Sequence, residues 1–137
     1  MRVLLDNNIS PLVARAIHIL VEAEGDRAAA FRDEFPADAP DVRWIGELGR
    51  RGAWVVISGD VQITRRAAER AAWRSSGLVG FSFEPGWSRF KNTEKAARLL
   101  LWWPRIREQA GLVAGGAMFQ LPIKAGSKLK QLQVERR

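Results

Sequence analysis

The 137-residue sequence predicts an α/β domain with a mainly parallel sheet and helices on both of its faces. Two observations carry this prediction. Short, continuous apolar runs, typical of strands buried in a parallel sheet, alternate with longer segments whose apolar residues recur at helical spacing. No internal repeat, low-complexity linker or second domain interrupts the alternation. Residues 1–123 are therefore predicted to form one domain, and residues 124–137 a basic C-terminal tail.

The amino-terminal segment predicts the first strand and the first helix. Val3–Leu5 is a short apolar run that fits a buried strand. Ser10 is a suitable N-cap, and Pro11 suits the first position of a helix, where a missing N–H costs nothing. Apolar residues then recur at helical spacing to about Glu24, and Gly25 is expected to end the helix.

The next segment predicts a strand, a helix and a second strand. Ala28–Phe31 is a candidate strand, and an irregular acidic loop follows it. A helix is expected from Asp41 to about Arg50. The run "AWVVIS", residues 53–58, is the clearest strand in the chain, and Asp60 follows it after one glycine.

The second half of the chain repeats this alternation. An arginine-rich helix is expected over residues 63–73, a strand over 78–83 and a longer helix over 93–103. Pro104 is expected to break or kink that helix, because proline removes a backbone hydrogen bond and clashes with the preceding turn, and a further turn is expected to run on to Gln109. The last strand is expected within residues 116–123.

Charge is distributed unevenly along the chain. The net charge is +7 and the isoelectric point is near 11.0. Residues 1–60 hold seven Lys and Arg against ten Asp and Glu, whereas residues 85–137 hold eleven against three. This distribution suits a protein that binds a divalent cation at one place and a phosphate backbone at another, and nucleic acid is the first candidate partner. The alternative is a basic tail that binds nothing specific.

Several classes of protein are excluded by composition. The sequence has no cysteine, which excludes disulfides and thiolate zinc sites, and its one histidine, His18, leaves oxygen ligands for any metal. No apolar stretch approaches the roughly 20 residues needed to span a bilayer. Asp6 interrupts the N-terminal apolar run before a signal peptide could form. We therefore expect a cytoplasmic protein without a membrane segment.

Acidic residues follow the two clearest strands. Asp6 ends the first strand and Asp60 follows the central one, so both are expected in the crevice at the carboxyl ends of the sheet. Asp41, at the start of its helix, can reach the same crevice, and Glu47 lies further along that helix. Converging carboxylates repel one another unless a cation such as Mg²⁺ or Mn²⁺ compensates. Metal-dependent phosphodiester hydrolysis is the reaction that best matches these residues.

Each aspartate also has a simpler interpretation as a cap. Asp6 could cap the turn before the first helix, Asp41 its own helix, and Asp60 the helix expected near residue 63. Capping alone does not explain why two of the three follow the two clearest strands.

The stretches "LLDNNISP" (4–11), "APDVRWIGELGRRGAWVVISGD" (39–60) and "ERAAWRSSGL" (69–78) resemble the PIN-like superfamily. That superfamily includes ribonuclease toxins of VapC type and a small group that begins "LLDENLSP". The resemblance covers residues 1 to about 105 and implies a three-layer α/β/α PIN-like fold with a Mg²⁺- or Mn²⁺-dependent nuclease site.

Carried over to this sequence, the resemblance makes Asp6, Asp41 and Asp60 the acidic cluster. The family carries an acid where this chain has Asn7, and Asn8 is expected to support the site or the turn. Many PIN nucleases have a fourth acid soon after the third. Here Glu69 is too distant along the sequence to be assigned that role.

The resemblance also implies partners. RNA is the expected substrate, a small antitoxin protein is the expected inhibitor, and a homodimer is considered. Trp87, Trp102 and Trp103 are candidates for a partner surface, with the alternative that tryptophans fill the core. The residues considered for nucleic-acid contact are the cations Arg65, Arg66, Lys91, Lys124, Lys128 and Lys130.

Two other functions remain open from the sequence. A catalytically silent PIN-like module that binds nucleic acid or protein would keep the fold and the basic face. A phosphoacceptor domain of the receiver type would use Asp60 as the acceptor, with Lys124 after a late strand. Receivers usually pair two acids after their first strand, where this chain has Asn7 and Asn8.

Overall fold

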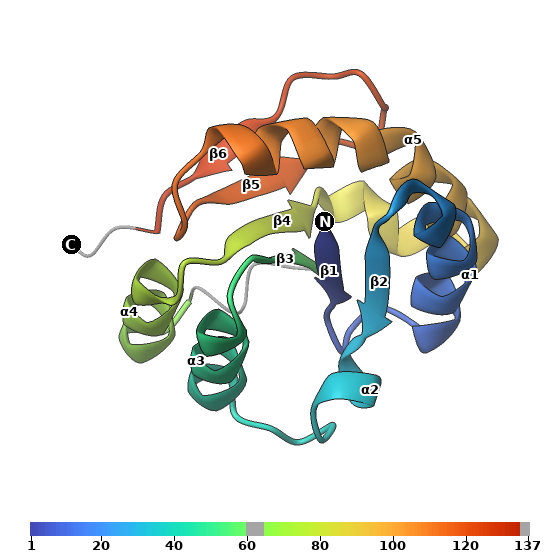
Figure 1. The fold of residues 1–137 in the computed structure, drawn as a ribbon. Helices are drawn as coiled ribbons and strands as arrows, with labels where there is room; N and C mark the ends of the chain where they lie inside the picture. Colours follow the sequence, from blue (N-terminus) through green and yellow to red (C-terminus); the bar gives the residue numbers. More distant parts are fainter. Residues whose placement is uncertain (60–64, 135–137) are drawn as a thin grey trace.

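The computed structural model describes residues 1–59 and 65–134, which form a six-stranded sheet covered by helices on both faces (Figure 1). This arrangement confirms the predicted three-layer α/β/α fold class. In chain order the elements are β1 (Arg2–Leu5), α1 (Pro11–Val21), the 3₁₀ helix η1 (Glu22–Glu24), β2 (Arg27–Ala30), α2 (Phe31–Glu34), α3 (Asp41–Arg51), β3 (Trp54–Ser58), α4 (Ala67–Ser76), β4 (Val79–Phe83), the 3₁₀ helix η3 (Pro85–Arg89), α5 (Asn92–Leu112), β5 (Met118–Leu121) and β6 (Lys130–Leu132).

The sheet has the strand order β2-β1-β3-β4-β5-β6. Strands β1 to β5 are parallel to their neighbours, and β6 is antiparallel to β5. On β1, Val3 lies opposite Ala28 of β2 and Val55 of β3. Every residue of β3 is buried. The continuous apolar sequences of β1 and β3 follow from this position, because central parallel strands are covered on both faces.

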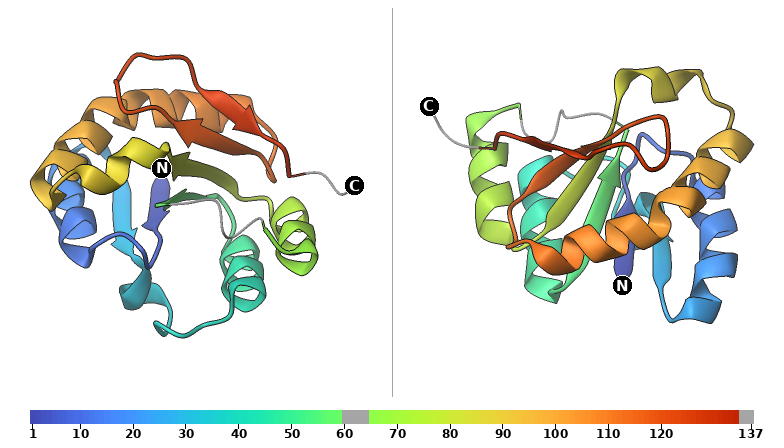
Figure 2. Two further views of the ribbon diagram at one scale, coloured as in Figure 1. Left: turned by 180° about the vertical axis from the view of Figure 1, so that it is seen from behind. Right: turned by 90° about the horizontal axis from the view of Figure 1, so that it is seen from above.

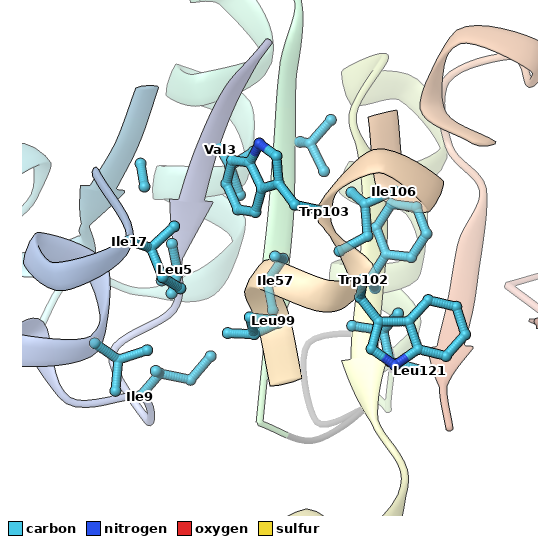
Figure 3. Packing of buried hydrophobic residues seen from close by; sticks show 14 of the residues in the cluster. Val3, Leu5, Ile9, Ile17, Ile57, Leu99, Trp102, Trp103, Ile106 and Leu121 are labelled. Carbon is cyan, nitrogen blue, oxygen red and sulfur yellow. The ribbon is translucent and has the colours of Figure 1, made fainter. Parts of the chain in front are cut away.

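Two apolar cores separate the sheet from its helical layers. Helices α1 and α5 pack on one face, and α2, α3 and α4 on the other (Figures 1 and 2). Figure 3 shows the first core, in which Trp102 and Trp103 of α5 lie among aliphatic side chains of the sheet. Trp87 is also fully buried. The expectation that these three tryptophans form a partner surface is therefore wrong, and their indole rings fill the core.

The connections after β1 and β3 leave the sheet on opposite faces. The chain passes from β1 through α1 to β2 over one face, and from β3 through α4 to β4 over the other (Figures 1 and 2). In doubly wound sheets of this order, the carboxyl ends of two such neighbouring strands border a crevice in which ligands bind. The carboxyl ends of β1 and β3 are therefore the expected place for a functional site.

Helix α5 contradicts the first of the two expectations for Pro104, that of a break. The helix runs without a break from Asn92 to Leu112, with Pro104 inside it. Pro104 is exposed, whereas Trp102, Trp103 and Ile106 on the opposite side are buried. The buried side chains on both sides of the proline anchor the helix to the core, and this packing outweighs the lost backbone hydrogen bond.

Other boundaries differ from the sequence prediction by a few residues. Phe31 begins α2 and does not end β2. The helix expected from residue 63 begins at Ala67, while residues 60–64 lie outside the described part of the chain. Within residues 124–134, β6 adds an antiparallel strand that the sequence did not suggest. Among the residues described here, no helix has the length and apolar character needed to cross a membrane.

Candidate active site

Asp6 lies at the carboxyl end of β1 and is 8% exposed. Its Oδ1 accepts a hydrogen bond from the backbone N–H of Asn7 at 2.7 Å, and its Oδ2 accepts one from Ser58 Oγ at 3.0 Å. Ser58 is the last residue of β3 and is buried. The two hydrogen bonds orient the carboxylate at the junction of the two central strands.

Asn8 connects this junction to the start of the loop after β3. Its Oδ1 accepts from the Gly59 backbone N–H at 2.9 Å, and its Nδ2 lies 3.4 Å from Ser58 Oγ. A Cβ on Gly59 would lie 3.1 Å from the Asn8 amide, so glycine suits this close approach. Asp60, the third predicted acid, follows Gly59 directly and lies outside the described residues.

Asn7 connects the same junction to the segment that leads into α3. Its Nδ2 donates to the Ala37 carbonyl at 3.0 Å, and its Oδ1 accepts from Arg32 Nε at 3.0 Å. The amide thus acts as donor and acceptor at once. Ala37 precedes Asp41 by four residues, so this contact ties the end of β1 to the chain that carries the second acid.

Asp41 is the first residue of α3, directly after Pro40. Its Oδ1 accepts a hydrogen bond from Trp44 Nε1 at 2.9 Å. Within the described part of the chain no side chain caps α3, and α1 is capped by Ser10, whose Oγ accepts from the Leu12 N–H at 3.2 Å. The structure therefore gives Asp6 and Asp41 hydrogen bonds other than those of helix caps.

Glu47 lies on α3 in contact with two cations. Its carboxylate is 2.9 Å from Arg50 and 3.8 Å from Arg51. It also lines a pocket of about 620 Å³ between α3 and the segment before it, together with Phe35 and Trp44. Its described contacts are those of a surface ion-pair network, which contributes little to stability.

Glu69 is an acid that the sequence did not assign to the site. It is 9% exposed on α4, and it lines a pocket of about 440 Å³ with Asp41 and Arg66. The packing of α3 against α4 brings these residues together. One sequence signal could have indicated this burial. Glu69 lies four positions before Trp73, so the two side chains share one face of α4, and both are buried.

The described acids suit a hard cation. Within residues 1–59 and 65–134, no group of three or more His, Cys, Asp or Glu side chains is placed to hold a metal ion. Asp6 offers carboxylate oxygens at the switch point of the sheet and Asp41 offers them at the start of α3, while Asp60 lies outside the described residues. Mg²⁺ needs oxygen ligands and is usually held by one or two carboxylates plus waters and substrate phosphates. The donor chemistry therefore fits Mg²⁺ or Mn²⁺.

The six cations predicted to contact nucleic acid lie at one end of the sheet. All six belong to chain segments at the carboxyl ends of the parallel strands, and all are exposed. They lie before α4 (Arg65, Arg66), before α5 (Lys91), after β5 (Lys124, Lys128) and at the start of β6 (Lys130). Asp6, Asp41 and these cations therefore belong to segments at the same end of the parallel strands.

The fold is that of a doubly wound α/β/α protein, and the buried Asp6 lies at its switch point. The family described as "PIN like domain" matches residues 1–85. The chain belongs to this family, and the match indicates a nuclease-type module. No curated protein matched the sequence, and no solved structure matched the chain.

Proposed function

We propose that the protein is a metal-dependent endoribonuclease that hydrolyses RNA phosphodiester bonds with Mg²⁺ or Mn²⁺. The supporting observation is the position of Asp6 at the β1/β3 switch point, where its carboxylate is oriented by Ser58 at the end of β3. Asp41 and Asp60 complete the proposed acidic cluster, and Glu69 adds a fourth carboxylate beside Asp41.

Each residue has a separate role in this proposal. Asp6, Asp41 and Asp60 provide oxygen ligands, and Ser58 with the Asn7 N–H fixes the direction of the Asp6 carboxylate. When bound, a divalent cation would supply an activated water and would compensate charge on the phosphate. The exposed cations at the same edge would bind phosphates on either side of the cleaved bond.

We extend the proposal to a toxin that is held inactive by an antitoxin protein, with a homodimer as a further assembly. Large exposed apolar side chains are available for protein contacts on the outer helices. They are Leu12, Ile19 and Leu20 of α1, Val42 of α3, and Leu101 and Leu112 of α5. Exposed apolar groups of this kind are typical of protein-binding surfaces when they are contiguous.

The test is RNA cleavage by the full chain in Mg²⁺ or Mn²⁺ and in EDTA. Asp6→Asn and Asp60→Asn should each lower cleavage and divalent-metal affinity by about 100-fold or more without unfolding the protein, because each removes a charged ligand. Asp33→Asn is a matched control, since Asp33 is half exposed on α2 and lies 3.6 Å from Arg15.

Unchanged metal binding in both site variants would defeat the proposed site. RNA binding without metal-dependent cleavage would instead support the silent binding module.

A further inference from the structure

Two consecutive asparagines follow Asp6, and each bonds a different distant segment through both ends of its amide. We propose that Asn7 and Asn8 are positioning residues that assemble the acidic site from three separate parts of the chain. Asn7 holds the segment that carries Asp41, and Asn8 holds the segment that leads to Asp60. This inference rests on the proposed function, because it concerns the geometry of the same site.

The Asn7 contact requires an amide. Its Nδ2 donates to the Ala37 carbonyl at 3.0 Å, while its Oδ1 accepts from Arg32 Nε at 3.0 Å. An aspartate could accept from Arg32 but could not donate to Ala37, and its carboxylate would face a carbonyl oxygen. The resembling family carries an acid here. In this chain both ends of the side chain are engaged in holding residues 32 and 37.

The Asn8 contact acts on the other side of Asp6. Its Oδ1 accepts from the Gly59 N–H at 2.9 Å, and its Nδ2 approaches Ser58 Oγ at 3.4 Å. Ser58 Oγ in turn donates to Asp6 Oδ2 at 3.0 Å. One continuous set of hydrogen bonds therefore joins the carboxylate at the end of β1 to the residue that precedes Asp60.

The two contacts explain why amides stand beside the acid. A metal site built from separate segments needs each carboxylate held at a defined position, and outer hydrogen bonds provide this. Neutral amides supply donors and acceptors without adding charge to a site that already holds several carboxylates. Asn7 and Asn8 are consequently assigned to support, and the carboxylates to ligation.

Mn²⁺ binding to the full chain, measured by calorimetry, tests the assignment. Asn7→Ala, Asn7→Asp and Asn8→Ala should each weaken Mn²⁺ affinity by about 10- to 100-fold, the usual effect of losing an outer hydrogen bond to a metal site. Asn92→Ala is the matched control, because Asn92 is the only other asparagine and is exposed at the start of α5. The Mn²⁺ affinity of the Asn92→Ala variant should equal that of the wild type.

Asn7→Asp separates the positioning role from a ligand role. If residue 7 occupies a ligand position, the added carboxylate tightens Mn²⁺ binding, and the inference is overturned. Wild-type affinity in both Asn7→Ala and Asn8→Ala would overturn it as well. A merely structural role would lower the melting temperature of these variants and leave the Mn²⁺ affinity unchanged.

Amide exchange measured by NMR keeps the two proposals distinguishable. If the wild type binds no Mn²⁺, the proposed function fails, but the contacts can still be tested. Asn8→Ala should speed exchange of the Gly59 amide by about tenfold or more, because that N–H loses its acceptor. Asn7→Ala should do the same for the Ala39 amide, which bonds Pro36 in the held segment. Unchanged exchange at both amides would refute the positioning role itself.

Discussion

Asp6 and Asp26 are buried aspartates at opposite ends of the parallel strands, and the hydrogen-bond donors described for them differ in charge. Asp26 lies just before β2, at the amino ends of the strands, and is 6% exposed. Its carboxylate accepts from the Met1 ammonium at 2.7 Å, from Trp103 Nε1 at 2.8 Å and from Arg107. Asp6 lies at the carboxyl ends of the strands and accepts hydrogen bonds from the Asn7 backbone N–H and the Ser58 hydroxyl.

The partners determine what each charge can do. Burial by itself raises the pKa of Asp26, but hydrogen bonds from the Met1 ammonium, Arg107 and Trp103 together lower that pKa to about 2. The Asp26 carboxylate therefore links the chain before β1, the start of β2 and α5 through its hydrogen bonds. The described donors to Asp6 are neutral groups that set the direction of its carboxylate. Location and orientation make Asp6 the candidate ligand, whereas Asp26 is structural.

Replacement of Asp26, at the amino ends of the strands, should change the stability of the protein more than the other substitutions considered below. Asp26→Asn should lower the free energy of unfolding by about 3 kcal/mol, because it leaves the Met1 ammonium and Arg107 facing a neutral amide. The melting temperature should fall by roughly 10 °C. Calorimetry and RNA cleavage of the same sample check this. The contrast with Asp6 breaks down if Asp26→Asn loses cleavage while it keeps its wild-type melting temperature.

The next effect is the pH dependence of the same group. The folded-state pKa of Asp26, about 2, lies below its usual value of 3.8, so its stabilising contribution is complete only above about pH 5. This contribution, about 2 kcal/mol, should be lost progressively as the pH falls from about 5 through the folded-state pKa. Urea denaturation at several pH values should show this loss for the wild type relative to Asp26→Asn. Parallel curves for the two proteins would contradict it.

Replacement of exposed lysines at the carboxyl ends of the strands should have a smaller effect, on the affinity for RNA. Replacing Lys91 and Lys124 by alanine should weaken RNA binding several-fold and reduce the slope of log affinity against log salt by about 1 to 2. Both side chains are exposed, so stability should stay within about 0.5 kcal/mol of the wild type. Fluorescence anisotropy over a range of salt concentrations measures the slope. An unchanged slope would exclude these two residues from the phosphate contacts.

Local pattern was sufficient for much of the fold and for part of the site. The apolar run of β3, the Ser10 cap of α1 and the placement of Asp6 after β1 were predictable, because each depends on residues close together in sequence. The family resemblance is likewise carried by short stretches, and it is confirmed for residues 1–85. The assignments of Asp6, Asp41 and Asp60 as ligands stay predictions.

Contacts between distant segments were not predictable in the same way. The sequence places Glu69 far from Asp41, yet the packing of α3 on α4 puts both on one pocket. The low helical propensity of proline predicted a break or a kink at Pro104, and the break is absent because buried side chains on both sides of the proline hold α5 against the core.

The amino-acid sequence alone indicates the central strands, the acids that follow them and the excess of basic residues in the C-terminal half. These features are local or compositional, so periodicity and charge reveal them. The contacts of Asn7 with Ala37 and of Asn8 with Gly59, across 30 and 51 positions of the chain, depend instead on how the strands are ordered in three dimensions. Strand order and the faces taken by the crossovers bring those segments together, and neither is written in any short stretch of sequence.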